Sequence, residues 1–470
     1  MTTGSKTDYW RPVYHFTADN EWINDPNGLV YHDGIYHLFY QAGRYRRRWD
    51  HATSTDLTDW KLHGTKIADT PSIQAFSGGA VVDHTNTAGF GENALVCMYT
   101  GHHNDGTEDQ RIAYSTDGGA TVTKYDGNPI IESSVGDFRD PKPFWYSPDE
   151  SWRMVVGRIQ GTNDRRPGME IYSSDDLIDW TYESTYIDAD NEKWECPNLI
   201  QLPVSESTET KWMTIVSPIE NRFVEYHIGH FDGTEFIVED VIQADHGHDF
   251  YATQFWENTP EMRGLNISWM NNWAYAENLS DRGWHGSMTV PRTLELTETE
   301  TGIEVRQHPV SDVTEEHQKT VVEIPLTTVT STAGPLLRTD VVGATPEIVT
   351  TIELKDADVV GFRLQDGEQC QCAIKYNSCS EKLVFNRMDP DTTFNSEEYG
   401  CTSMPVEPRT DGTIQLRILI DQCSVEIFAN DGYRSMTNLV HSDLKKTDVG
   451  FFAEGGTAKI RDLVVYDLCK

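Results

Sequence analysis

The sequence lacks any apolar run long enough to cross a membrane. A membrane-spanning helix needs roughly 20 consecutive apolar residues, and no segment of the 470-residue chain approaches that length. The polar N-terminus, residues 1–11, also lacks the apolar centre of a secretory signal peptide. These absences argue against a membrane protein and predict a cytoplasmic location.

Basic residues are scarce. Lys and Arg total 38 against 75 Asp and Glu, which gives a formal net charge of −37. A surface of that sign repels nucleic acid and anionic lipid, so neither is expected as a partner. The acidic residues are spread along the chain, and their mutual repulsion weakens a compact fold unless salt screens it. We therefore expect a halophilic protein with a surface adapted to a salty cytoplasm. An ordinary acidic protein is the alternative.

Metal-binding patterns are also missing. A structural zinc site usually needs two matching CxxC pairs, and the eight cysteines do not supply them. Structural zinc is therefore not expected. Free thiols are expected, and one or two disulfides among the six C-terminal cysteines remain open. Two pairs of histidines are close in sequence, but no third ligand follows at a familiar spacing. We interpret them as solvated or rim residues, with a metal site as the alternative: His102 and His103, and His246 and His248.

Helical periodicity is nearly absent, whereas short β-rich runs separated by turn residues recur along the chain. Residues 28–31 and 35–40 flank Asp33-Gly34, which predicts a hairpin. Similar units follow at regular spacing, as expected for four-stranded sheets repeated radially in a β-propeller. The segment 54–60 is echoed at 174–180, and we interpret both copies as structural turns at the edges of blades.

The pattern changes after residue 303. Residues 304–320 are polar and suit a linker. Beyond them, runs such as 348–354 and 414–420 are typical of sandwich strands. The sequence therefore predicts an all-β protein with a propeller over 1–303, a linker over 304–320 and a β-sandwich over 321–470.

Three carboxylates have unusual neighbours. Asp25 lies in the segment Trp22–Gly28, whose Asn, Pro and Gly alone would indicate a turn. The aromatic Trp22 and the polar Asn24 beside it are what a sugar site requires.

Asp140 follows Arg139 directly. A plain salt bridge is one interpretation. The functional hypothesis is a carboxylate that the guanidinium keeps ionised so that it can bind two sugar hydroxyls. Glu195 is flanked by Trp194 and Cys196, which predicts poor solvation and a raised pKa, as a general acid needs. A buried structural Glu is the alternative.

Together these fragments resemble glycoside hydrolase family 32, the invertases, levanases, inulinases and fructan exohydrolases. Seven motifs occur in the family's order over most of the chain. Two carry substitutions: Ile23 stands where Met is commoner, and Cys423 replaces a usual Ser. The motifs are Trp22–Gly28, Phe76–Gly79, Arg139–Pro141, Glu195–Pro197, Asp249–Gln254, Gly283–Met288 and Asp421–Phe428.

The resemblance implies a five-bladed propeller followed by a sandwich, and a retaining hydrolase that releases terminal β-fructofuranosyl units from sucrose or short fructans. It implies Asp25 as nucleophile, Glu195 as general acid/base and Asp140 as transition-state stabiliser, with no metal or organic cofactor. The two reacting carboxyls are then expected about 5–5.5 Å apart. The implied fructose subsite comprises Asn24, Gln41, Trp49, Phe76, Ser77 and Arg139.

Two other functions remain open. A fructosyltransferase would use the same covalent intermediate, with a sugar in place of water. An inactive sugar-binding module is the other alternative, although the presence of all three carboxylates argues against it. Nothing in the sequence indicates an oligomeric state.

The chain departs from the family pattern after Gln41, where a shortened loop carries a basic cluster, and Asn198 replaces a frequent acidic residue. Because of these two departures, the resemblance does not define which leaving group the site accepts. One hypothesis is that the cluster binds an anionic leaving group such as a sugar phosphate. The interpretation that we favour is pairing with surface acids. The cluster is Arg44, Arg46, Arg47 and Arg48.

Overall fold

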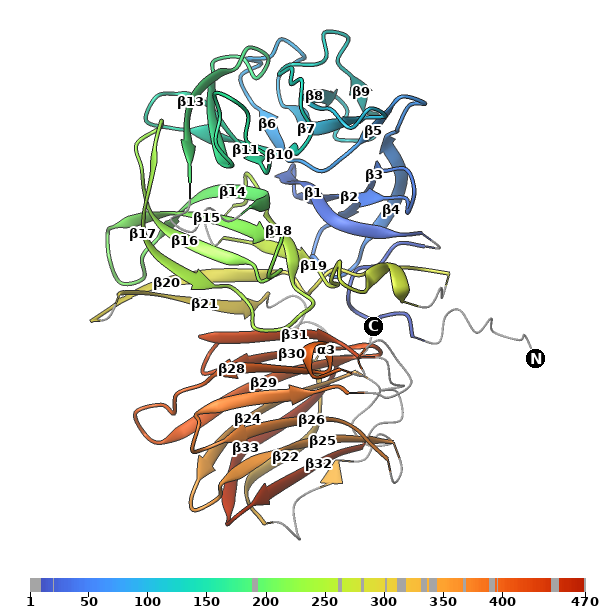
Figure 1. The fold of residues 1–470 in the computed structure, drawn as a ribbon. Coiled ribbons are helices and arrows are strands. Elements are labelled where there is room, and N and C mark those ends of the chain that lie inside the picture. The colour runs from blue at the N-terminus through green and yellow to red at the C-terminus, as the bar shows by residue number, and fades with distance from the viewer. Residues whose placement is uncertain are drawn as a thin grey trace, which may run out of the picture.

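The chain forms two β-rich parts, one above the other in Figure 1. The first part runs from blue to yellow in that view, and the second is orange to red. The computed structural model describes residues 10–19, 21–187, 193–260, 264–279, 283–300, 302–310, 318–330, 336–337, 345–366, 369–388, 394, 396–440 and 448–468.

The N-terminal part contains, over its described residues, five antiparallel sheets. The first has the order β1 (Ile23–His32), β2 (Ile35–Ala42), β3 (Arg48–Ser54), β4 (Lys61–Ile67). The second joins β5 (Ile73–Ala75), β7 (Ala94–His103), β8 (Glu108–Ser115) and β9 (Thr123–Lys124), with β6 (Ala80–Asp83) also paired to β7. The third is β10 (Phe138–Tyr146), β11 (Ser151–Arg158), β12 (Gly168–Ser174), β13 (Thr181–Tyr186). The fourth is β14 (Trp194–Pro203), β15 (Thr210–Pro218), β16 (Glu225–Phe231), β17 (Phe236–Gln243), and the fifth is β18 (Tyr251–Phe255), β19 (Asn266–Trp269), β20 (Arg292–Thr299), β21 (Gly302–Pro309).

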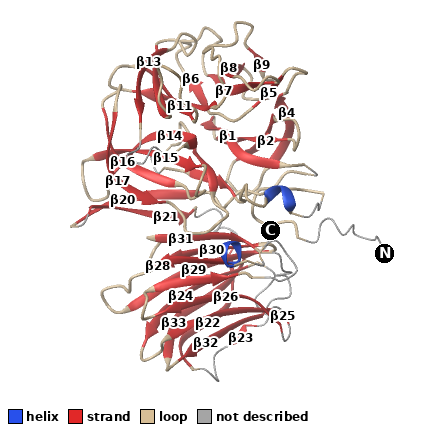
Figure 2. Cartoon of the chain, in the orientation of Figure 1, coloured by secondary structure: helices blue, strands red, loops and turns tan. Residues whose placement is uncertain are grey.

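The C-terminal part consists of two six-stranded sheets around one apolar core. One sheet has the order β22 (Gln318–Val329), β33 (Ala458–Leu468), β24 (Pro346–Leu354), β29 (Thr413–Asp421), β30 (Ser424–Ala429), β31 (Arg434–Leu439). The other has the order β23 (Leu336–Leu337), β32 (Asp448–Glu454), β25 (Val359–Asp366), β26 (Gln369–Asn377), β27 (Lys382–Asn386), β28 (Cys401–Pro405). The described helices are short, a 3₁₀ turn η2 (Ala276–Asn278) and α3 (Glu397–Gly400), as Figure 2 shows. None of them could cross a membrane.

The prediction of an all-β propeller followed by a sandwich is confirmed. The predicted linker 304–320 needs correction at both ends. Residues 302–309 form β21, which pairs with β20 as the last strand of the fifth sheet, and β22 already begins at Gln318. Strand β21 is the outermost of its sheet and alternates half-buried with buried side chains, so its sequence looks as polar as a linker.

The echoed segments 54–60 and 174–180 are structural turns, as predicted. Each joins the third and fourth strands of its sheet, β3 to β4 and β12 to β13. In both turns the first serine accepts a hydrogen bond from the leucine three residues on, and that leucine has positive φ, 65° at Leu57 and 64° at Leu177. Serine and aspartate side chains that bind nearby backbone N–H groups favour such turns.

Buried ion pairs hold the two parts together. Arg292 of β20 donates to Asp245 Oδ2 at 3.0 Å and to Glu426 of the sandwich strand β30, and all three side chains are inaccessible to solvent. Arg387, which follows β27 in the sandwich, donates to Asp249 Oδ2 at 2.5 Å. Asp249 lies two residues before strand β18, so this ion pair anchors the chain just where it enters the fifth sheet.

Candidate active site

The three predicted catalytic residues lie at the beginnings of the first strands of three sheets, and Tyr251, which had no predicted role, lies at the same place in a fourth. Asp25 is in β1, Asp140 in β10, Glu195 in β14 and Tyr251 in β18. Each of these strands has a register shift within its first five residues. A β-bulge bends its strand and redirects a side chain. The same distortion, repeated in four sheets, turns these polar side chains toward a shared site.

Asp25 is buried and held through one of its two carboxylate oxygens. Its Oδ2 lies 2.6 Å from the Ser77 hydroxyl and 3.9 Å from the Cys196 sulfur. Its Oδ1 is buried and accepts no hydrogen bond from any residue within the described ranges. A buried carboxylate oxygen without a partner is costly, so the geometry leaves one oxygen available to react with a bound ligand.

Asn24 and Gln41 support the nucleophile strand. Asn24 Nδ2 donates to Gln41 Oε1 at 2.9 Å, and Trp22 Nε1 donates to Asn24 Oδ1 at 3.0 Å. Gln41 Oε1 also lies 2.9 Å from the Ser77 hydroxyl. The single hydroxyl proton of Ser77 goes to Asp25, because the shorter contact is to the charged acceptor. These predicted subsite residues therefore form one buried network with Asp25.

Glu195 faces the same site. Its Oε1 accepts from Arg139 Nε at 3.2 Å and its Oε2 from the Tyr251 hydroxyl at 2.9 Å. Burial raises the pKa of Glu195, which is the predicted direction. Arg139 opposes that rise, and the nearby Asp25 adds to it. Burial thus favours the protonated form that a general acid requires.

Arg139 does not pair with its neighbour Asp140 in the way the functional hypothesis assumed. Its guanidinium donates to Glu108 Oε1 at 2.7 Å and Asp137 Oδ1 at 3.0 Å, besides Glu195. The register shift that begins at Arg139 interrupts the regular alternation of the strand. Arg139 reaches Glu108 on β8 and Glu195 on β14, as well as the nearby Asp137.

Asp140 has positive φ, 68°, and its Oδ2 accepts from the Cys196 backbone N–H at 2.8 Å. Burial, followed by the proximity of Glu195, raises the pKa of Asp140 to about 8. Arg139 acts in the predicted direction and lowers the pKa of Asp140, but burial and Glu195 outweigh it. A carboxyl group that carries a proton can both donate to and accept from sugar hydroxyls.

Trp49, another predicted subsite residue, is linked to Phe76 by a hydrogen bond. The side chain is fully buried and packs against Phe39 and Tyr99, and its indole N–H donates to the Phe76 carbonyl at 2.8 Å. It supports Phe76 from behind, whereas the Phe76 ring is half-buried and stacks on His102 with centroids 4.3 Å apart. Trp49 pairs with Gln41 across strands β2 and β3, and its role in the subsite stays a prediction.

The motifs did not reveal two functional side chains. Tyr251 lies in a recognised motif but had no assigned role. Glu108 lies in no motif, yet it receives hydrogen bonds from Arg139 and, at 3.0 Å, from His102 Nδ1. The strand β8 that carries Glu108 belongs to a different sheet from Arg139, so their proximity follows from packing between sheets.

The described histidines and cysteines show no metal site. His102 and His103 pair with Glu108 and Asp109, and no group of three potential ligands occurs within the described ranges. Three cysteines are free thiols: Cys97, Cys196 and Cys379. The Cys370 side chain and Cys469, which the disulfide hypothesis included, lie outside the described residues.

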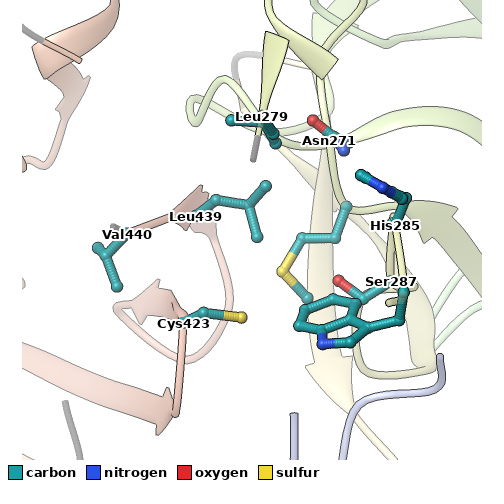
Figure 3. Close-up of a pocket in the computed structure, with 10 residues that line it drawn as sticks. Asn271, Leu279, His285, Ser287, Cys423, Leu439 and Val440 are labelled. Atoms are coloured by element: carbon teal, nitrogen blue, oxygen red, sulfur yellow. The ribbon is translucent and has the colours of Figure 1, made fainter. Parts of the chain in front are cut away.

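A small cavity lies between the two parts of the molecule. Figure 3 shows His285 and Ser287 on its propeller side and Cys423, Leu439 and Val440 on its sandwich side. Its volume is about 40 Å³, whereas ligand pockets commonly measure about 300–1,000 Å³. The cavity has no room for a sugar and is separate from the three carboxylates.

An available carboxylate oxygen and a second carboxyl of raised pKa that face one site are the pair of groups that glycoside hydrolases use. The family model for the N-terminal domain of glycosyl hydrolases family 32 matches residues 15–309, and its C-terminal counterpart matches residues 306–467. The chain belongs to glycoside hydrolase family 32.

Individual relatives span nearly the whole chain. A levanase from Bacillus subtilis (strain 168) is 35% identical over 98% of this chain and 71% of its own length. A second levanase, from Bacillus sp. (strain L7), is 32% identical, and the match covers 98% of this chain but 52% of that protein. Exo-inulinase from Aspergillus awamori has a TM-score of 0.87 at 27% identity, covering 97% of this chain and 98% of its own. A fructofuranosidase variant from Schwanniomyces occidentalis, complexed with fructosylnystose, has a TM-score of 0.90 at 26% identity, covering 100% of this chain and 99% of its own.

Proposed function

We propose that the protein is a retaining β-fructofuranosidase that releases terminal fructose from sucrose or short fructans. The observation that carries the proposal is the asymmetry of two carboxyls in one buried site. Asp25 has an unpaired oxygen, and Glu195 has a pKa raised by burial. Relatives named levanase, exo-inulinase and fructofuranosidase support fructosides as the substrate class.

The proposed reaction has two steps. Asp25 Oδ1 attacks C2 of the fructosyl unit while Glu195 gives its proton to the departing glycosidic oxygen, which leaves a covalent fructosyl-enzyme. Glu195, now a carboxylate beside Arg139 and Tyr251, then takes a proton from water as the water attacks C2. Free fructose departs, Asp25 is again a carboxylate, and Glu195 is again protonated. Asp140 binds ring hydroxyls throughout.

A substrate panel tests this function. We expect the purified protein to release fructose from sucrose, raffinose, inulin and levan at different rates, measured as reducing fructose over time. Each fructan should become shorter by losing fructosyl units from its fructosyl end. Absence of fructose from all four substrates would contradict the proposal.

Transfer to a sugar acceptor competes with hydrolysis for the same intermediate. Product analysis at high sucrose concentration separates the two: kestose-type trisaccharides indicate transfer, and equal amounts of glucose and fructose indicate hydrolysis. An inactive binding module would bind the substrates and form neither product.

Salt dependence follows from the charge of −37. We propose that the protein is adapted to a salty cytoplasm. The screening length falls from about 10 Å at 0.1 M salt to about 3 Å at 1 M, so mutual repulsion of the acidic surface weakens sharply. The melting temperature and the activity on sucrose should therefore both rise between 0.1 M and molar KCl. Values that do not change with salt would refute this adaptation.

A further inference from the structure

The four arginines of the shortened loop after Gln41 have different partners. Arg46 Nε donates to Asp69 Oδ2 at 2.5 Å, and Arg48 pairs with Glu21 at 3.0 Å and with Asp50 at 3.1 Å. These two satisfy the interpretation that the cluster pairs with acids.

Arg47 and Arg44 differ from their neighbours. Arg47 donates from Nη1 to the Gly43 carbonyl at 2.5 Å, and Arg44 donates from Nη2 to the Glu277 carbonyl at 2.7 Å. Neither has a carboxylate at ion-pair distance within the described part of the chain. Two arginines of the cluster therefore form no ion pair with a described residue.

The Arg47 guanidinium lies over two indole rings beside the nucleophile. Its central carbon is 5.4 Å from the Trp22 ring centroid and 5.8 Å from that of Trp273. Trp22 in turn binds Asn24, the residue before Asp25. Such stacking fixes the plane of a guanidinium while leaving the donors at its edge free.

Electrostatics place Arg47 at the catalytic site as well. Burial lowers the pKa of Arg47, and the attraction of Asp25 is the largest influence that opposes this, ahead of Glu277. Arg47 is partly exposed and its Nη1 donates to Gly43, which leaves Nε and Nη2 without a hydrogen-bond acceptor among the described residues. A cation with reduced hydration and no carboxylate partner favours a ligand that brings acceptor oxygens.

The loop holds this arrangement firmly. Gly43 N–H donates to the Trp22 carbonyl at 3.1 Å, and the Arg47 backbone N–H donates to Gln74 Oε1 at 2.9 Å. Gly43 has a φ of 87°, and a β-carbon there would lie 2.3 Å from the Arg46 carbonyl oxygen. The tight turn at Gly43 is therefore part of the loop that holds Arg47 over Trp22 and Trp273.

We propose that Arg47 determines leaving-group specificity: its guanidinium donates hydrogen bonds to acceptor oxygens of the sugar that departs when Asp25 attacks. The inference rests on the proposed fructosidase function and names a contact within that site. The acceptors are hydroxyl oxygens of a neutral sugar, such as the glucose of sucrose. A sugar phosphate would present the same kind of oxygen.

The test compares substrates that share the fructosyl unit and differ in the leaving group. Methyl β-D-fructofuranoside releases methanol, which is too small to reach Arg47. We expect Arg47→Ala to lower kcat/KM for sucrose about 10- to 100-fold more than for the methyl fructoside, the range that one or two charge-assisted hydrogen bonds give. Arg46→Ala, in the same loop but paired with Asp69, is the matched control and should leave the ratio of the two values unchanged.

Each outcome separates the inference from the function. Equal losses on both substrates, or no loss on sucrose, would overturn the role of Arg47. A wild-type protein that releases fructose from neither substrate would overturn the proposed function itself. Sucrose 6-phosphate identifies the acceptor: kcat/KM equal to that of sucrose assigns Arg47 to hydroxyls. A preference for the phosphate that Arg47→Ala removes assigns it to the phosphate.

Discussion

Replacing Asp25 with Ala should lower kcat for sucrose by about four orders of magnitude or more while the protein stays folded. The substitution removes the oxygen that forms the covalent bond, and loss of a nucleophile has effects of this size. The Asp25 side chain accepts hydrogen bonds from Ser77 and Cys196 alone among the described residues, so its removal disturbs little of the surrounding network. Initial rates and far-UV circular dichroism measure the two parts of this expectation.

The matched control for this variant lies on the same hairpin. Asp33 occupies the turn between β1 and β2, its side chain is 87% exposed, and its φ of 48° suits Asn. Asp33→Asn should therefore retain wild-type activity. Activity of Asp25→Ala close to that of the wild type would remove Asp25 from the mechanism.

Replacing Glu195 with Gln should lower kcat/KM for sucrose about 10²- to 10⁴-fold, the usual contribution of a general acid. The loss should be much smaller for β-D-fructofuranosyl fluoride, because fluoride departs without needing a proton. Glu209→Gln, an exposed position in the loop between β14 and β15, is the control and should behave as wild type. Equal losses on both substrates would show that Glu195 is not the acid.

The pH profile gives a second test of Glu195. An acid must be protonated to act, so kcat/KM of the wild type should fall as the pH rises through the pKa of Glu195. Burial raises that pKa, which extends activity toward neutral pH. The fall should be absent from the Glu195→Gln profile, since glutamine does not titrate.

The sequence predicted the fold class, and it singled out three carboxylates because each lies within a motif of distinctive neighbours. Chain order alone could not reveal what each one touches. Arg139 finds Glu108 on another sheet, and its expected partner Asp140 binds the Cys196 backbone instead. Contacts of this kind depend on how the sheets pack, and no spacing along the chain encodes them.

The start of the linker was wrong for a related reason. It was placed within β21 because the outer strand of a sheet contacts water and lacks a strong apolar pattern. The error arose where local sequence is a poor guide to burial.

The buried ion pairs between the two parts have a consequence for chimeras. Joining this propeller to the sandwich of a relative would place Arg292 and Asp249 opposite unfamiliar side chains. Losing one partner of a buried ion pair typically costs about 3–5 kcal/mol, a large share of a protein's net stability. A stable chimera should therefore keep Glu426 together with Arg292, and Arg387 together with Asp249. The two domains should accordingly be exchanged as one piece.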